Sequence, residues 1–206
     1  MRSNINELVG TFFIVLTASL TANPLAVGFM LCAMTYMGFQ ISGAHYNPAV
    51  TFAVFIRQGI KGDTALSYMT MQVTGGLLAG LLYYLLKGST FAPQPSLEST
   101  NMSAMLIELL FTTILILTYL QVCTARKAMG NQYYGLAMGF VYGAAYAAGV
   151  SISGGVFNPA YAIGTIVPDF LLGGQNLGNL GIYIVGPFVG SLLSIIIFKS
   201  INPEME

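Results

Sequence analysis

A nine-residue segment occurs twice in this chain, and it constrains the fold more than any other feature. It reads Ser-Gly-Ala-His-Tyr-Asn-Pro-Ala-Val at 42–50 and Ser-Gly-Gly-Val-Phe-Asn-Pro-Ala-Tyr at 153–161. Asn can cap a helix with its side-chain oxygen, and Pro suits the first helical position because its fixed φ fits a helix. The pattern therefore predicts two helix starts, at Asn47-Pro48-Ala49 and at Asn158-Pro159-Ala160.

The composition places the chain in a membrane. Of the 206 residues, 55% are apolar and only 7% are charged, and the mean hydropathy is +0.74. A soluble domain would carry roughly a quarter charged residues. The formal net charge is zero, without a run of Lys or Arg, so nucleic-acid binding is not expected. His45 is the only histidine, and no metal or other cofactor is expected.

Six apolar segments can be drawn at about 20 residues per membrane span. They lie roughly at 5–22, 25–41, 64–87, 102–123, 132–150 and 179–199. The segments that follow each Asn-Pro-Ala, about 47–56 and 158–167, are too short to cross a bilayer and are typical of half-helices. Extended backbone before each Asn is tolerable at membrane depth only where it is buried in protein or lines a water-filled cavity. We therefore expect a pore or binding site at the midplane.

The chain also contains an internal repeat. The run Glu7-Leu-Val-Gly-Thr corresponds to Glu108-Leu-Leu-Phe-Thr, and the polar linker 88–100 separates halves at about 1–87 and 101–206. Three spans per half is an odd number, so the second half must enter from the opposite side. The sequence predicts a single all-α membrane domain with six transmembrane helices, two re-entrant half-helices and inverted three-helix repeats.

Charge predicts the orientation of this domain. With six spans, most basic residues fall on one face, namely Arg2, Arg57, Lys61, Arg126, Lys127 and Lys199. Lys87 falls on the other face, together with Glu98 and Asp169. Lys and Arg accumulate on the cytoplasmic side of membranes, so both termini are expected there, or on the matrix side of a mitochondrial membrane. Paired glycines one turn apart, such as Gly76/Gly80 and Gly186/Gly190, predict close helix crossings.

The duplicated motif, with Ser-Gly upstream of each Asn, resembles the aquaporin (major intrinsic protein) family over essentially the whole chain. This resemblance implies a passive channel for water and small neutral solutes, with one pore per subunit of a homotetramer and no enzymatic step. It also implies a narrow filter, which ungapped spacing from each Asn places at Val27, Tyr146, Gly155 and Tyr161.

The residues themselves suggest how such a pore would work. Half-helices from opposite sides meet at their N-termini, each carrying about half a positive charge that repels cations. Asn47 and Asn158 would offer N–H donors to a water, which must then turn its hydrogens outward. The expected carbonyl acceptors along one wall are those of Gly43, Ala44, His45, Tyr46, Gly154, Gly155, Val156 and Phe157. The opposite wall would be apolar.

Glu7 and Glu108 are ionisable residues inside predicted spans, and they allow two interpretations. They could form a proton relay, or each could accept hydrogen bonds from the irregular backbone before a half-helix. Two symmetric copies without a basic partner favour loop support, in agreement with what the resemblance implies.

The filter departs from the family pattern in a way that leaves two outcomes open. Tyr161 stands where the family usually has Arg, and Tyr146 stands where water-selective members often have His. The small Val27 and Gly155 could leave a wider, apolar constriction that admits glycerol, urea or ammonia beside water. Alternatively, the two phenol rings could meet across the pore and plug it.

Other functions are weighed against the channel. The first alternative is a non-conducting aquaporin-like structural subunit, in a larger membrane assembly. A secondary transporter would need a coupling-ion site, for which only Glu7 and Glu108 are available. An enzyme is least favoured, because neither a Ser/His pair nor a paired-Asp or metal-ligand constellation is present in the sequence.

Overall fold

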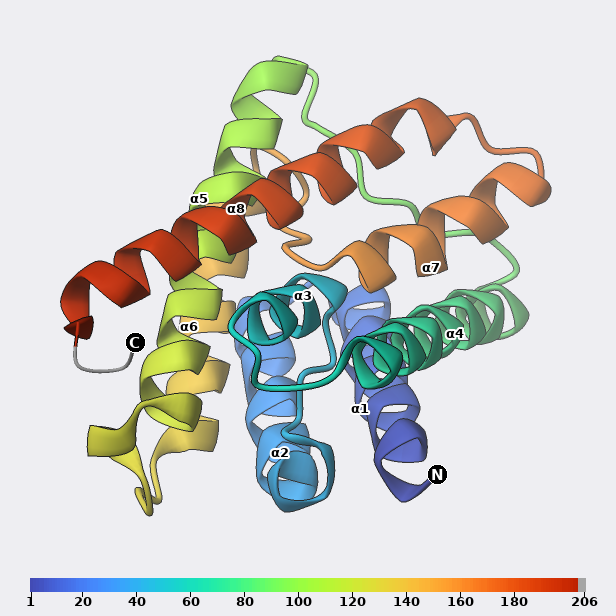
Figure 1. Cartoon of the computed structure of the whole chain (residues 1–206). Helices are drawn as coiled ribbons and strands as arrows, with labels where there is room; N and C mark the ends of the chain where they lie inside the picture. The colour runs from blue at the N-terminus through green and yellow to red at the C-terminus, as the bar shows by residue number, and fades with distance from the viewer. Residues whose placement is uncertain (204–206) are drawn as a thin grey trace.

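The computed structural model describes residues 1–203, and over this range the chain folds into eight α-helices joined by short turns and one longer linker (Figure 1). Six of the helices are long: α1 (Arg2–Thr21), α2 (Pro24–Ser42), α4 (Gly62–Lys87), α5 (Asn101–Tyr119), α6 (Tyr134–Gly149) and α8 (Leu180–Ile201). Two are short: α3 (Pro48–Ile56) and α7 (Pro159–Leu171). The all-α prediction is confirmed.

The helix bounds agree with the apolar segments to within a few residues. Five helical segments are long and apolar enough to cross a membrane, at Arg2–Thr21, Pro24–Ser42, Gly62–Lys87, Asn101–Thr124 and Asn176–Ile201. The last two include the π-helical turn Leu120–Thr124 after α5 and the 3-10 turn Asn176–Asn179 before α8. Helix α6, the expected fifth span, has 16 residues and is about 24 Å long.

The six long helices pack in three pairs, of which only one joins the two halves of the chain. Helix α1 packs on α4, and α5 packs on α8, while α2 packs on α6. The short helices lie next to each other near the centre, with α3 between α4 and α8 and α7 against α4 (Figure 1). This arrangement brings the two Asn-Pro-Ala segments together inside a ring of longer helices.

Helix α7 continues beyond the expected end at residue 167. The prediction ended it before Pro168, since Pro normally interrupts a helix. In the structure Pro168 lies inside α7, where the carbonyl of Gly164 has no N–H four residues later to accept from. That carbonyl faces Gly80 of α4, and a Cβ built there would lie only 2.1 Å from the oxygen. The carbonyl freed by Pro168 therefore lies at the closest contact between α7 and α4.

Glycine permits the close contact between α7 and α4, and other close helix crossings as well. A Cβ on Gly164 would lie 2.3 Å from the carbonyl carbon of Gly76, and one on Gly28 of α2 would lie 2.6 Å from the Gly139 carbonyl of α6. Neither position leaves space for a methyl group. In lipid, where helices gain little from hiding apolar surface, such backbone contact is what holds them together.

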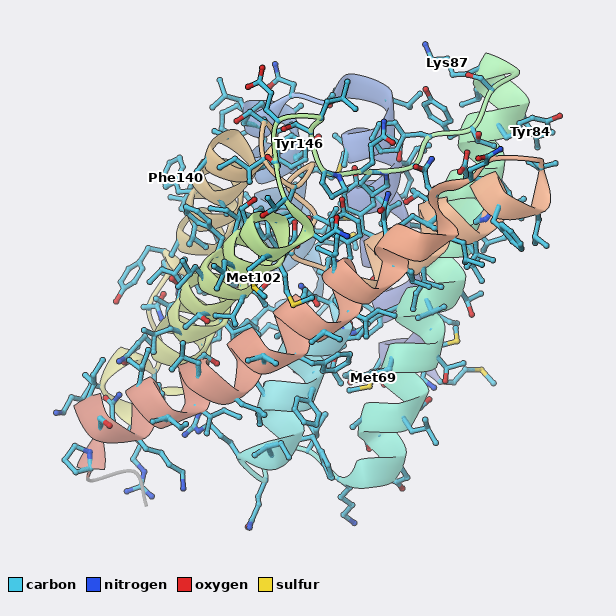
Figure 2. The ribbon with its side chains drawn as sticks, turned by 90° about the horizontal axis from the view of Figure 1, so that it is seen from above. Met69, Tyr84, Lys87, Met102, Phe140 and Tyr146 are labelled. Atoms are coloured by element: carbon cyan, nitrogen blue, oxygen red, sulfur yellow. The ribbon has the colours of Figure 1, made fainter. Side chains whose placement is uncertain are left out.

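The outer surface exposes many large apolar side chains, more than is usual for a protein in water. Large apolar side chains on several helices point outward, including Leu25, Leu66, Leu85 and Leu171. Figure 2 shows Phe140 of α6 at the outer edge of the molecule, with Tyr84 and Lys87 at one end of α4. The surface is that of an integral membrane protein.

Candidate functional site

The two half-helices begin as the Asn-Pro-Ala pattern predicts. Asn47 caps α3, its Oδ1 accepting from the backbone N–H of Ala49 at 2.9 Å. Asn158 caps α7 in the same way, with Oδ1 accepting from Ala160 at 3.0 Å. Both caps have extended backbone, and Pro occupies the first helical position in both helices.

The same two asparagines also join the half-helices to each other. Asn47 Nδ2 donates to the carbonyl of Phe157 at 2.8 Å, and Asn158 Nδ2 donates to the carbonyl of Tyr46 at 3.0 Å. Each amide therefore uses one of its two hydrogens in this cross-link and makes no second donor contact among residues 1–203.

The backbone leading to each Asn has a matched irregular conformation. Positive φ angles occur four, three and one residues before each Asn: Gly43, Ala44 and Tyr46 in the first loop, and Gly154, Gly155 and Phe157 in the second. For a residue with a side chain this conformation costs about 1–3 kcal/mol, so surrounding contacts must hold it in place. The two glutamates provide such contacts.

Glu7 of α1 is fully buried and accepts hydrogen bonds from the first loop. Its Oε1 accepts from Ser42 Oγ and from the N–H of His45 at 3.0 Å. Its Oε2 accepts from the N–H of Tyr46 at 2.7 Å and from Gln72 Nε2 at 2.7 Å. All four donors keep the loop in one conformation.

Glu108 of α5 makes the corresponding contacts with the second loop. Its Oε1 accepts from Ser153 Oγ at 2.7 Å and from the N–H of Val156 at 2.9 Å. Its Oε2 accepts from the N–H of Phe157 at 2.5 Å. Apart from the bond between Glu7 and Gln72 of α4, the bonds of both carboxylates thus go to the segments before the half-helices, and none of the donor groups is an ionisable side chain.

A small cavity of about 10 Å³ lies where the half-helices meet. Asn47, Asn158, His45 and Tyr46 line it from the loops. The remaining wall is mostly apolar and comes from five helices, through Ile14, Leu31, Val50, Leu115, Met138 and Tyr142. This volume is about the least that holds one water molecule.

The structure divides the expected carbonyl acceptors into two groups. Four already accept from the protein: Gly43 from the Tyr119 hydroxyl at 2.8 Å, Val156 from the Tyr142 hydroxyl at 3.0 Å, and Tyr46 and Phe157 from the asparagines. Within residues 1–203, the carbonyls of Ala44, His45, Gly154 and Gly155 have no hydrogen-bond donor. The second group keeps its acceptor capacity.

The four filter residues are closed to water in this structure. The exposed fraction is 0% for Val27, 1% for Tyr146 and 0% for Tyr161, and Gly155 is buried. The Tyr161 hydroxyl lies beside that of Tyr146, in a geometry that falls short of a standard hydrogen bond. No water molecule fits against these side chains in this structure.

The linker 88–100 covers the filter from outside. Phe91 stacks on Tyr161, with ring centroids 6.4 Å apart and ring planes at 9°. Thr90 Oγ1 donates to the carboxylate of Asp169 at 2.6 Å and anchors the linker on the end of α7. The linker and the filter therefore form one packed unit.

Sequence reasoning did not single out Tyr119 or Tyr142, whose hydroxyls occupy two of the expected acceptors. The signal for Tyr142 was present, because it precedes Tyr146 by four residues and so shares its helix face. Tyr119 carries no comparable signal, since its contact with Gly43 depends on where α5 meets the first loop.

Comparison with known proteins agrees with this architecture. The model of the family described as major intrinsic protein matches residues 1–198. The glycerol uptake facilitator protein-like 6 of Lactiplantibacillus plantarum is 30% identical, with 94% of this chain and 95% of that protein covered. The aquaporin AqpM of Methanothermobacter thermautotrophicus is 29% identical over 87% of this chain and 76% of its own length.

A solved structure shares the fold. The aquaglyceroporin from Plasmodium falciparum superposes with a TM-score of 0.85, covering 99% of this chain and 98% of that chain at 19% identity. The chain belongs to the major intrinsic protein family, and the predicted aquaporin fold is confirmed. It is a membrane channel protein and not an enzyme.

Proposed function

We propose that the protein is a passive channel for water, with passage in single file between Asn47 and Asn158. The observation that carries this proposal is the cavity lined by both asparagines, which has room for about one water. A water there can accept the free amide hydrogen of each Asn and must turn its own hydrogens away. The relatives named for water and glycerol conduction support the same class of permeant.

The half-helix N-termini would keep cations out. Helices α3 and α7 direct their N-termini at this cavity from Asn47 and Asn158, each end equivalent to about half a positive charge. Burial leaves little solvent to screen that field. This electrostatic barrier would supply part of what an Arg at position 161 supplies elsewhere in the family.

The buried filter bears on which solutes can pass. Because Tyr146 and Tyr161 are buried against each other, a solute can pass only if these side chains move. We propose that water needs a smaller movement than glycerol, urea or ammonia. Glycerol, urea and ammonia remain secondary candidates. The alternative is that the two tyrosines stay closed and the protein acts as a structural subunit of a larger membrane assembly.

Glu7 and Glu108 are proposed to support the loops, and the chain to consist of inverted repeats at about 1–87 and 101–206. The matched backbone angles before each Asn and the matched bonds of the two carboxylates support both ideas. We further propose cytoplasmic termini, from the basic residues that gather on one face, and a homotetramer in the lipid bilayer.

Osmotic shrinkage of proteoliposomes, followed by light scattering, tests the channel proposal. Wild type is expected to shrink faster than empty liposomes with water as permeant, and Tyr161→Ala to shrink several-fold faster because it removes a ring from the filter. Tyr161→Arg serves as the comparison with the usual family residue. If wild type matches empty liposomes while Tyr161→Ala conducts, the structural-subunit alternative replaces the channel.

A further inference from the structure

Tyr142 occupies the lumen next to the asparagine pair. It lies on α6, one turn before the filter residue Tyr146, and it lines the same cavity as Asn47 and Asn158. Its side chain is buried, with an exposed fraction of 2%. A phenol ring therefore stands at the midplane, opposite the groups that would bind a permeating water.

Two contacts hold this ring in place. The hydroxyl donates to the carbonyl of Val156 at 3.0 Å, and the ring meets Phe157 edge to face, with centroids 6.5 Å apart and planes at 85°. Both partners belong to the second loop, which Glu108 fixes through the N–H groups of the same two residues. Swinging Tyr142 aside would break this buried hydrogen bond and leave the Val156 carbonyl without its donor.

The space left by the ring is about 10 Å³, enough for a single water and far too small for urea or glycerol. The Val156 carbonyl already accepts a hydrogen bond from Tyr142, so it is not available as an acceptor for a permeating molecule. A larger polar solute would thus meet both a narrower lumen and fewer hydrogen-bond partners at this point.

From these contacts we propose that Tyr142 is a second size-selecting residue, at the midplane and independent of the outer filter. The inference rests on the proposed channel function and deepens it by naming water, not polyols or urea, as the class of permeant. Opening the outer filter alone leaves Tyr142 in place, so it raises water flux without admitting glycerol.

A cycle of variants in proteoliposomes tests this inference. Wild type, Tyr161→Ala, Tyr142→Ala and the double variant are compared for water shrinkage and for glycerol uptake. Tyr84→Ala is the matched control, since it removes another phenol ring from the outer surface of α4, away from the cavity, where Tyr84 is 36% exposed. Tyr142→Leu is used in addition, in case alanine leaves a cavity that prevents folding.

The expected result is that Tyr161→Ala remains closed to glycerol, whereas the double variant passes it at least about tenfold faster, the scale on which pockets discriminate by size. Tyr84→Ala should behave as wild type. Equal glycerol uptake by Tyr161→Ala and the double variant would overturn the inference, whether both conduct or neither does. Water flux through wild type tests the channel proposal separately. The role of Tyr142 is judged only by comparing Tyr161→Ala with the double variant.

Discussion

Single side chains hold the centre of this molecule together through bonds between distant parts of the chain. The amides of Asn47 and Asn158 each reach across to the loop before the other half-helix. Behind each loop a buried carboxylate accepts hydrogen bonds from N–H groups that have no partner in a regular helix. Buried N–H groups must be satisfied somewhere, and in lipid no water replaces a lost acceptor.

Glu108 offers a direct test at this scale. Glu108→Ala removes the acceptor for Ser153 Oγ and for the N–H groups of Val156 and Phe157, at a cost of about 1–3 kcal/mol for each buried donor left unsatisfied. We expect a clear loss of thermal stability in detergent and an intermediate loss for Glu108→Gln, which keeps one acceptor oxygen. Glu98→Ala, in the exposed part of the linker, is the control and should melt as wild type. Equal melting of Glu108→Ala and wild type would contradict loop support.

At the scale of whole elements, contact between backbones positions the half-helices. Helix α7 lies against α4 at Gly76, Gly80 and Gly164, where added Cβ atoms would approach backbone atoms to between 2.1 and 2.3 Å. Because backbone cannot give way as a flexible side chain does, these glycines determine how near α7 comes to the pore axis.

Gly164→Ala should therefore destabilise the protein by about 1–3 kcal/mol, the usual cost of overpacking. Gly181→Ala is the matched control, because Gly181 lies in α8 with nothing within 4 Å of its added Cβ. That substitution should be neutral or stabilising, since alanine favours a helix by about 1 kcal/mol over glycine. Thermal unfolding of both variants in the same detergent gives the comparison. Similar melting of the two would show that the α4–α7 crossing can relax.

At the scale of the whole molecule, the outer surface offers a place for another subunit. A groove of about 540 Å³ runs between α2 and α6. Small residues form much of its floor, among them Pro24, Gly28, Gly143 and Ala147. Such surfaces allow close approach of further helices, so the groove is compatible with the proposed homotetramer.

Native mass spectrometry from lipid nanodiscs tests the tetramer. We expect a species of four chains, each of 21.9 kDa, that persists in mild detergent. A mass of one chain under both conditions would contradict the proposal, and a mass that includes a different protein would favour the larger-assembly alternative.

Some features follow from neighbouring residues alone and were predictable. The helix starts at Pro48 and Pro159 depend on an Asn cap and a proline with suitable φ, which are local properties. The long helices follow from apolar runs of sufficient length. Helix α7 ends at Leu171 instead of about 167 and carries Pro168 inside it, a difference within the few residues to which local signals place a helix end.

By itself, the sequence determined the class of protein: a lipid-embedded, all-helical chain with two half-helices and two asparagines at the centre of the molecule. Those conclusions depend on composition, spacing and local backbone preference. Only the tertiary structure decided how closely the expected filter and the asparagine pair are packed, because Phe91 against Tyr161, and Tyr142 against Val156, are contacts between separate elements. Whether a tyrosine lines a pore or fills it depends on distances of an ångström or two between helices, which no local pattern encodes.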